Sequence, residues 1–372
     1  MSSTPVARRL GPWLRSRLPE LDPVLLAVIG VLGLLGLVTL YSAASDHPGR
    51  FGEQLRNYAL AAVLMIAVAG LSPRRLKQLA LPVYTVGIVL LVAVLVAGVS
   101  VKGAQRWLDL GVMRVQPAEI MKLGVPLMLA WYFDRREGAV RKMDFVAAAM
   151  LVFAPVALIV RQPDLGTAML VLAAGFFVMF LAGLPWLWLA VMTGGAVASL
   201  PVAWLLMHDY QRSRILTLVD PMSDPLGKGF HTLQAMIAIG SGGLFGKGWM
   251  QGTQTHLEFI PERTSDFIFA VYSEEFGLIG NLLLLALFLV LVVRALQIAF
   301  QASSSFTRLL AGAIAMILFT FAFVNMAMVS GILPVVGVPL PFISYGGTAL
   351  VTLGMACGML MCVQSNRKVV QM

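Results

Sequence analysis

Long apolar runs separated by short polar joints make up most of this chain. A helix needs ~20 mainly apolar residues to cross the hydrocarbon core of a bilayer. Membrane barrels instead show short segments of alternating polarity, so these runs predict helices. The ten predicted spans cover residues 24–41, 56–71, 79–99, 118–133, 145–160, 166–183, 186–206, 267–293, 309–330 and 343–363. We therefore expect an all-α polytopic bundle of about ten transmembrane helices that forms one integral-membrane domain over residues 1–372.

The composition also indicates a lipid environment. The 372 residues are 59% hydrophobic and only 12% charged, with a mean hydropathy of +0.86. A soluble domain of this size needs more charge to cover its surface. The formal net charge of +9 comes from cations scattered at loop ends, without the basic stripe that is typical of nucleic-acid binding. Nucleic acid is therefore not an expected partner.

The cysteines and histidines do not indicate a metal site. Cys357 and Cys362 both lie in the last apolar run, where they are expected to be core or lipid-facing thiols. His231 has no His, Cys or Asp partner at the spacing that zinc requires. We expect no metal site and no cofactor, and assistance by a divalent cation such as Mg²⁺ or Mn²⁺ stays an open alternative.

Lysine and arginine concentrate in alternate joints, which predicts the orientation of the chain, because these residues favour the cytoplasmic side. They gather in the N-terminal lead-in and then near residues 74–77, 135–142, 308 and 367–368. Both termini are therefore expected in the cytoplasm. Two segments on the opposite side, 100–117 and 207–266, carry cations against this tendency, which indicates that they hold an anion.

The outer segment 207–266 alternates apolar stretches with glycine-rich joints, which predicts short helices at the membrane interface. Its end, HLEFIPERTSDFIFAVYSEEFG, is the strongest candidate for chemistry. Asp266 stands there at the mouth of an apolar helix, in a charge cluster that includes Glu262. In one interpretation Thr264, Ser265 or Asp266 caps the helix. In the other, Asp266 is a general base held partly desolvated at the membrane surface.

Two further motifs place charges at the starts of predicted helices. In RVQPAEIMKLGVP, Glu119 and Lys122 are three residues apart and share one helix face, so they can pair. Such a pair in a membrane helix faces the bundle or a polar cavity, where it serves packing, binds substrate directly, or does both. In RQPDLGTA, Arg161 and Asp164 lie in a tight turn. The simplest interpretation is a helical hairpin with Asp164 as the N-cap.

Other cations and one break in the chain are also candidates. Arg212 and Arg214 suit a diphosphate, because guanidinium groups match phosphate oxygens; contact with lipid headgroups is the alternative. Lys247 lies in GSGGLFGKGW, which lacks the features of a nucleotide P-loop but still presents a cation. In LPVVGVPLPFISYGGTAL, irregular backbone at membrane depth must be buried or line a cavity. We expect a cavity wall there, with Ser344 and Tyr345 as hydrogen-bond donors.

The motifs QPAEIMK, QPDLGT, HLEFIPERTSDFIFAV and LPVVGVPLPFISYGG resemble, in order and spacing, those of the SEDS family (shape, elongation, division and sporulation) of bacterial membrane proteins. The resemblance extends over essentially the whole chain. The stretch LFGKGWMQGTQT is similar to the elongation branch of the family rather than to the division branch. The departures are small: Ala118 stands where serine is commoner, and Thr264-Ser265 precedes Asp266 where His-Thr is frequent.

The resemblance implies a peptidoglycan glycosyltransferase that polymerises lipid II, the undecaprenyl-diphosphate-linked disaccharide pentapeptide, during cell elongation and rod-shape maintenance. It implies a class B penicillin-binding protein transpeptidase and other elongation-complex membrane proteins as partners, and an active site on the periplasmic face of the inner membrane. On the family pattern Asp266 is the catalytic carboxylate, and Glu119 and Lys122 form a required pair. The expected substrate-binding residues are Arg106, Arg161, Asp164, Arg212, Arg214, Lys247, Glu262, Ser344 and Tyr345.

Other functions fit part of this pattern. A lipid II flippase or another transporter shares the cavity and the membrane-embedded acid. It needs polar residues along a path through the bilayer, however, whereas the cytoplasmic halves of the predicted spans are apolar. A non-catalytic scaffold for wall-synthesis enzymes does not account for the density of charge on the outer face. A division-branch protein with the same activity is the third alternative.

Overall fold

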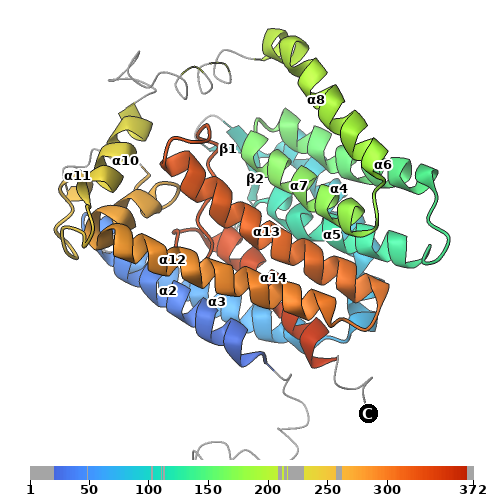
Figure 1. Cartoon of the computed structure of the whole chain (residues 1–372), viewed down its shortest axis with the longest axis horizontal. Coiled ribbons are helices and arrows are strands. Elements are labelled where there is room, and N and C mark those ends of the chain that lie inside the picture. The colour runs from blue at the N-terminus through green and yellow to red at the C-terminus, as the bar shows by residue number, and fades with distance from the viewer. Residues whose placement is uncertain are drawn as a thin grey trace, which may run out of the picture.

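The computed structural model describes residues 21–366 apart from 48, 102–103, 110, 112–113, 208–211, 213–215, 217–229 and 257–261. Most of the described residues lie in helices that pack side by side (Figure 1). The helices are α2 (Pro23–Ala43), α3 (Gly49–Ala69), α4 (Pro73–Ala97), α5 (Pro117–Asp134), α6 (Lys142–Arg161), α7 (Leu165–Leu181), α8 (Trp186–Leu206), α10 (Phe230–Ser241), α11 (Thr253–His256), α12 (Ile268–Phe300), α13 (Ser305–Val329) and α14 (Gly347–Ser365). Helices of 17 to 33 residues occupy all ten predicted spans, which confirms the predicted helical membrane fold.

Six of the described helices are long and apolar enough to cross a membrane by length and composition alone. They are α2, α4, α6, α12, α13 and α14. Helix α7 has 17 residues, and α5 carries Glu119, Lys122 and Asp134 within its 18 residues. The chain is a multi-pass membrane protein.

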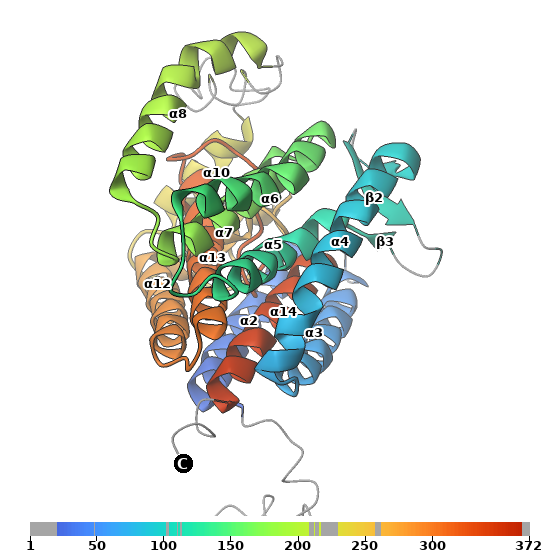
Figure 2. The same cartoon turned by 90° about the vertical axis from the view of Figure 1, so that its right-hand side faces the viewer.

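Helix α5 lies at the centre of the bundle, in contact with α4, α6, α7, α13 and α14 (Figure 2). Nearly all of its side chains are buried, including Glu119 and Lys122. A membrane helix can carry charged side chains where other helices surround it, because those side chains then avoid the lipid tails. Its central place therefore explains why a span with two charged side chains still belongs to the bundle.

Helices α3 and α14 pack closely through two glycines spaced four residues apart. A Cβ atom added at Gly354 would lie 2.7 Å from the carbonyl oxygen of Ala61, and one at Gly358 would lie 2.5 Å from that of Met65. Small residues at this spacing let membrane helices approach closely and gain van der Waals contact. The C-terminal helix is thereby fixed against the N-terminal part of the chain.

Helix α12 is kinked at Gly277, which has φ 64° and ψ −160°. A kink leaves helix carbonyl and N–H groups without their usual partners. The glycine-rich loop that follows α10 supplies them: the Lys247 N–H donates to the Glu274 carbonyl at 3.0 Å, and the Leu278 N–H donates to the Gly243 carbonyl at 2.9 Å. The glycines of the GSGGLFGKGW motif thus allow the backbone of this loop to approach the backbone of α12 closely.

A small antiparallel sheet connects α4 to α5, and the sequence pattern did not predict it. Its strands, in the order β1-β2-β3, are β1 (Val99–Val101), β2 (Ala104–Asp109) and β3 (Arg114–Val115). These strands are too short to show a clear alternation of polar and apolar residues. The turn after β2 has a local cause, because the Asp109 carboxylate accepts from the Gly111 N–H at 2.9 Å and Gly111 has φ 79°.

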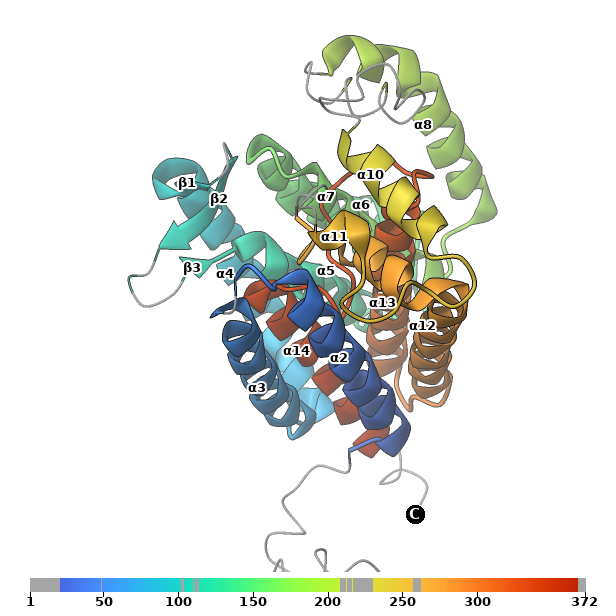
Figure 3. The ribbon, with the colours of Figure 1, turned by 90° about the vertical axis from the view of Figure 1, so that its left-hand side faces the viewer.

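The outer segment contains short helices, as predicted. Helices α10 and α11 lie beside the start of α12 (Figure 3). Helix α8, which precedes them, extends away from the rest of the bundle, and most of its described side chains are exposed (Figure 2). Residues 213–215, 217–229 and 257–261 of this segment lie outside the described residues.

Candidate active site

Asp266 lies in the turn of residues 262–267 that leads into α12. The N–H groups of Ser265 and Phe267 donate to the Glu262 carbonyl at 3.0 and 3.3 Å, and Glu262 has φ 54°, in the left-handed region. The N-cap position of α12 falls on Phe267. The interpretation that one of the three residues before Phe267 caps the helix is therefore not supported, and Asp266 belongs to the turn itself.

Hydrogen bonds from two distant segments hold this turn. The Arg50 guanidinium, from α3, donates to the Thr264 hydroxyl at 3.0 Å. The Tyr345 N–H donates to the Thr264 carbonyl at 2.8 Å, and the Ser344 hydroxyl donates to the Ser265 carbonyl at 2.7 Å. Ser344 and Tyr345 belong to the irregular segment between α13 and α14, residues 330–346, called here the outer loop. They therefore position the turn that carries Asp266.

The outer loop also forms a wall beside the Asp266 carboxylate. A Cβ atom added at Gly337 would lie 3.3 Å from Asp266 Oδ2, and Gly337 has φ 73°. The Asn325 side chain, on α13, donates to the Asp266 carbonyl at 2.9 Å and to the Val338 carbonyl at 2.6 Å. The irregular segment that was predicted to line a cavity thus lies next to the predicted catalytic carboxylate.

Glu119 and Lys122 form the predicted pair on α5. Lys122 Nζ lies 2.5 Å from Glu119 Oε1, and their side chains are 2% and 9% exposed. Lys122 Nζ also lies 4.7 Å from the ring centroid of Phe321 on α13. Glu119 Oε2 is buried and receives no hydrogen bond from the described residues. The pair is therefore buried in the bundle, and one of its carboxylate oxygens has no hydrogen-bond partner among the described residues.

Helix α13 links this pair to the turn that carries Asp266. Phe321, beside Lys122, and Asn325, bonded to Asp266, are four residues apart on α13. Residues at this spacing lie one above the other on one helix face, about 6 Å apart. The ion pair and the turn that carries Asp266, which are distant in the sequence, therefore both contact this face of α13.

Asp164 caps α7 and joins the hairpin to the sheet. Its carboxylate accepts from the Thr167 N–H at 3.2 Å and from the Gln116 side chain at 3.0 Å, which confirms the N-cap interpretation. The Arg106 guanidinium, on β2, donates to the Pro163 carbonyl, and its Nη1 atom lies 3.8 Å from Asp164 Oδ1. Because Gln116 directly precedes α5, these contacts bring Arg106 and the QPDLGT motif to the end of α5 that carries Glu119.

Two other predicted cations are bound elsewhere. Lys247 Nζ lies 2.7 Å from Glu274 Oε1 and donates to the Thr253 hydroxyl at 2.7 Å. Glu274 is fully buried, so Lys247 neutralises a buried charge on α12. Arg212 donates to the carbonyls of Trp204 and Leu205 at the end of α8, at 2.9 and 2.8 Å. Both predicted cations therefore have intramolecular partners.

The remaining predicted residues differ in their surroundings. Arg161 is exposed at the end of α6, and the Glu262 carboxylate accepts from the Ser265 hydroxyl at 2.9 Å. The Tyr345 hydroxyl donates to Glu53, and burial together with that carboxylate raises the pKa of Tyr345 to about 12. Arg214 lies outside the described residues.

Sequence reasoning missed three residues that hold this site: Arg50, Gln54 and Asn325. The Gln54 side chain donates to the Ser344 carbonyl at 3.1 Å and accepts from the Gly346 N–H at 3.3 Å. Each of the three is a polar residue at or within an apolar helix, and that is the signal that identifies such residues. Within the described part of the chain, no group of three or more His, Cys, Asp or Glu residues is arranged to hold a metal ion.

Comparison with known proteins identifies the family. The model of the FtsW/RodA/SpoVE family of cell cycle proteins matches residues 22–369. The chain belongs to this family. Its sequence is 48% identical to the peptidoglycan glycosyltransferase MrdB of Escherichia coli K12 over 350 residues, which cover 94% of this chain and 95% of that protein. It is 34% identical to the probable peptidoglycan glycosyltransferase FtsW of Trichlorobacter lovleyi over 365 residues, which cover 95% of each chain.

Solved structures agree with this assignment. A chain from a peptidoglycan synthase complex that coordinates polymerization and crosslinking matches with a TM-score of 0.82 at 34% identity. The rod shape determining protein RodA of Thermus thermophilus matches with a TM-score of 0.72 at 32% identity. Each match covers 94% of this chain and 98% of the other. The predicted resemblance to the SEDS family and to its elongation branch is confirmed.

Proposed function

We propose that this protein is a peptidoglycan glycosyltransferase that polymerises lipid II into glycan strands during cell elongation and maintains rod shape. The observation that carries the proposal is the placement of the Asp266 carboxylate against the outer loop, in a turn bonded to the same face of α13 that the buried Glu119–Lys122 pair contacts. The relatives named peptidoglycan glycosyltransferase support the same activity.

In the proposed reaction Asp266 is the general base. It takes the proton of the acceptor's 4-hydroxyl as that oxygen attacks the anomeric carbon of the donor sugar. The bond between that carbon and the undecaprenyl diphosphate breaks, and its electron pair leaves with the diphosphate. Cations can stabilise this leaving group without a protonated acid, so one carboxylate is sufficient. This differs from glycoside hydrolysis, in which two carboxyl groups share the work.

We assign the diphosphate to the cations at the end of the bundle where α5, α7 and the sheet meet. Arg106 and Lys122 lie there, and Arg161 is exposed in the adjacent turn between α6 and α7. Lys122 contacts Glu119, and we assign the second oxygen of that carboxylate to a donor from the substrate. Lys247 and Arg212 have intramolecular partners and are assigned no direct contact with the diphosphate.

We place the active site on the periplasmic face of the bacterial cytoplasmic membrane, with both termini in the cytoplasm. The opposite end of the bundle is where α4 starts, α5 ends and α13 starts. These ends meet at Asp134, which pairs with Lys77 and accepts from the Phe306 N–H at 2.9 Å. Arg74, Arg75, Arg135 and Arg136 are also at that end, as expected for a cytoplasmic face.

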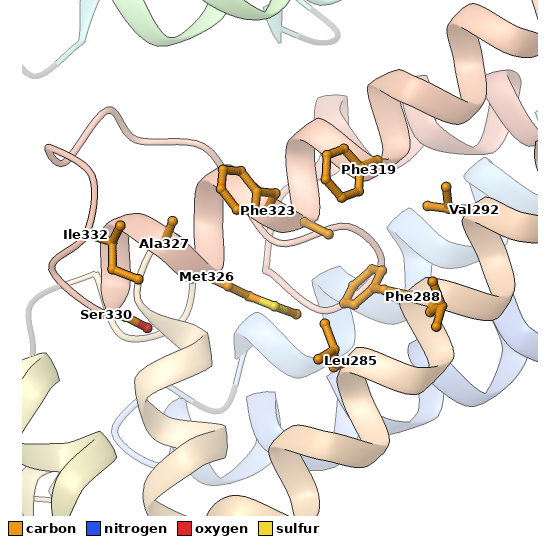
Figure 4. Close-up of a pocket in the computed structure, with 11 residues that line it drawn as sticks. Leu285, Phe288, Val292, Phe319, Phe323, Met326, Ala327, Ser330 and Ile332 are labelled. Atoms are coloured by element: carbon orange, nitrogen blue, oxygen red, sulfur yellow. The ribbon is translucent and has the colours of Figure 1, made fainter.

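Apolar grooves on the outside of the bundle suit the isoprenoid tails. One, of about 300 Å³, lies between α12 and α13 and is lined by aromatic and aliphatic side chains that include Phe288, Phe319 and Phe323 (Figure 4). Another, of about 560 Å³, lies between α6, α7 and the start of α8.

We propose that a class B penicillin-binding protein is the partner, because the matching solved complex joins polymerization to crosslinking.

The decisive experiment supplies lipid II to the full-length protein purified with its transpeptidase partner and measures the polymer on a gel. Asp266→Asn is expected to lower the polymerisation rate by at least ~10²-fold, because general base catalysis contributes that much or more. Glu137→Gln, which removes an exposed carboxylate at the other end of the bundle, is the matched control and should polymerise normally. Wild-type rates from folded, partner-bound Asp266→Asn protein would show that Asp266 is not the base.

A lipid II flippase is the second candidate, because the buried Glu119–Lys122 pair resembles the charges that mark transport pathways. Fluorescent lipid II in protein-containing vesicles distinguishes the two functions. Translocation by Asp266→Asn protein that no longer polymerises would favour transport.

Cell shape distinguishes the two family branches, since loss of an elongation enzyme rounds cells whereas loss of a division enzyme makes filaments.

A further inference from the structure

Asn325 is a buried amide in the otherwise apolar second half of α13. Its side chain is fully buried, and its NH₂ group donates to the carbonyls of Asp266 and Val338 at 2.9 and 2.6 Å. Both acceptors are carbonyl oxygens, so only the NH₂ end of the amide can face them, which fixes the orientation of the side chain. One amide therefore joins the turn that carries Asp266 to the outer loop.

The two bonds use the full donor capacity of this side chain. Serine and threonine of similar size have one donor, aspartate in its ionised form has none, and glutamine is longer by one methylene. A buried polar group in an apolar helix is costly unless it is bonded, and here the NH₂ group is bonded whereas Oδ1 has no partner among the described residues. Asparagine is therefore the residue that can bridge two carbonyls at this position of α13.

The two hydrogen bonds of Asn325 hold the backbone atoms that determine the direction of the Asp266 carboxylate. Fixing the Asp266 carbonyl fixes the backbone from which its side chain extends. Fixing the Val338 carbonyl fixes the residue directly after Gly337, whose added Cβ would lie 3.3 Å from Asp266 Oδ2. The spacing between the carboxylate and the wall beside it thus depends on Asn325.

We propose that Asn325 is a positioning residue that holds Asp266 at the angle and depth needed to take the acceptor's proton. This inference rests on the proposed role of Asp266 as general base. Asn325 also lies one helix turn from Phe321, which contacts Lys122, so α13 sets the base and the ion pair from one rigid element. A displacement of about 1 Å at a reacting group lowers a rate by about 10²-fold.

The test compares Asn325→Asp and Asn325→Ser in the full-length protein with its transpeptidase partner. Asn325→Asp has nearly the same shape but loses the NH₂ group and places carboxyl oxygens against two carbonyl oxygens, whereas Asn325→Ser keeps one donor. We expect kcat for polymerisation to fall by about 10²-fold in Asn325→Asp and by less in Asn325→Ser, with KM for lipid II changed by less than about threefold. Asn281→Asp is the matched control, because Asn281 is an amide on α12 whose oxygen accepts from Ser273 at 3.0 Å.

A double-variant cycle separates positioning from general loss of structure. In an Asp266→Glu background with residual activity, adding Asn325→Asp is expected to lower kcat by less than about threefold, because the base is already displaced. If the falls in kcat of the two single variants multiply in the double variant, the inference is wrong. It is also wrong if Asn325→Asp raises KM and leaves kcat unchanged. Unchanged kcat in folded Asn325→Asp protein overturns it too. Wild-type activity of Asp266→Asn would instead refute the proposed function, so the two failures are distinguishable.

Discussion

Removing one member of the Glu119–Lys122 pair is expected to affect stability differently from removing both. The charges are 2.5 Å apart and nearly inaccessible to solvent. At an effective dielectric constant of ~20 their attraction is about 7 kcal/mol. The cost of removing two ions from water is several kcal/mol for each ion, so the net contribution of the intact pair is small. A single substitution, in contrast, leaves one buried charge without its partner.

We therefore expect Glu119→Gln and Lys122→Met each to lower the free energy of unfolding by roughly 3–5 kcal/mol. The double variant has no charge at these two buried positions. Its free energy of unfolding is therefore expected to fall by less than about 2 kcal/mol. Denaturant unfolding in detergent, with the four proteins compared side by side, measures these values. Losses that simply add in the double variant would refute the reasoning, because they would show that the two charges do not depend on each other.

Polymerisation by the same four proteins decides between the two roles that the sequence left open for this pair. If the pair binds substrate, the double variant stays inactive although its stability recovers. Recovery of activity together with stability would assign the pair to packing alone. The stability and activity measurements must be made on the same preparations, because a destabilised single variant is inactive under either role.

Two further predictions concern the surroundings of the turn. Gly337→Ala places a Cβ 3.3 Å from the Asp266 carboxylate at a residue with φ 73°. We expect the polymerisation rate to fall about tenfold and the free energy of unfolding to fall by ~1 kcal/mol. Gly138→Ala, at φ 78° with open space around it, should show the loss of stability without the loss of activity. Burial raises the pKa of Asp46, but the Arg263 guanidinium and other hydrogen bonds outweigh it and hold the pKa below 3.8. The stabilisation by this pair is therefore present at neutral pH and is lost as the pH falls through that lowered pKa. Asp46→Asn should lower stability by less than about 1 kcal/mol at pH 7, and a difference from wild type that grows toward pH 3 would contradict this sign.

The sequence predicted every long helix of the bundle, because a run of apolar residues leaves a membrane chain few alternatives to a helix. It placed several ends incorrectly. Helix α3 begins at Gly49 rather than at 56, and α12 continues to Phe300 rather than to 293. The reason is physical: hydropathy marks the part of a helix that lies in lipid, whereas hydrogen bonding continues the helix into the polar interface.

The candidate site was predicted in its parts but not in its connections. The motifs with Glu119, Asp164 and Asp266 were identified, and the structure brings their elements to one end of the bundle. The sequence could not show that Lys247 has a buried partner in Glu274, because that pairing depends on how a loop folds over the kink of α12. The same limit applies to Asn325, whose two acceptors become neighbours only in the folded chain.

The turn that carries Asp266 is fixed residue by residue from separate parts of the chain. Arg263 donates to the Ala43 carbonyl at the end of α2, and the next three residues are held by α3, the outer loop and α13. A catalytic carboxylate gains rate from such pre-organisation because little movement is needed to reach the reactive geometry. The four anchoring elements lie more than 300 residues apart in the sequence at their extremes, from Ala43 to Ser344. The segment 207–266 can therefore act only within the assembled bundle, which explains why helices from both ends of the chain belong to the active site.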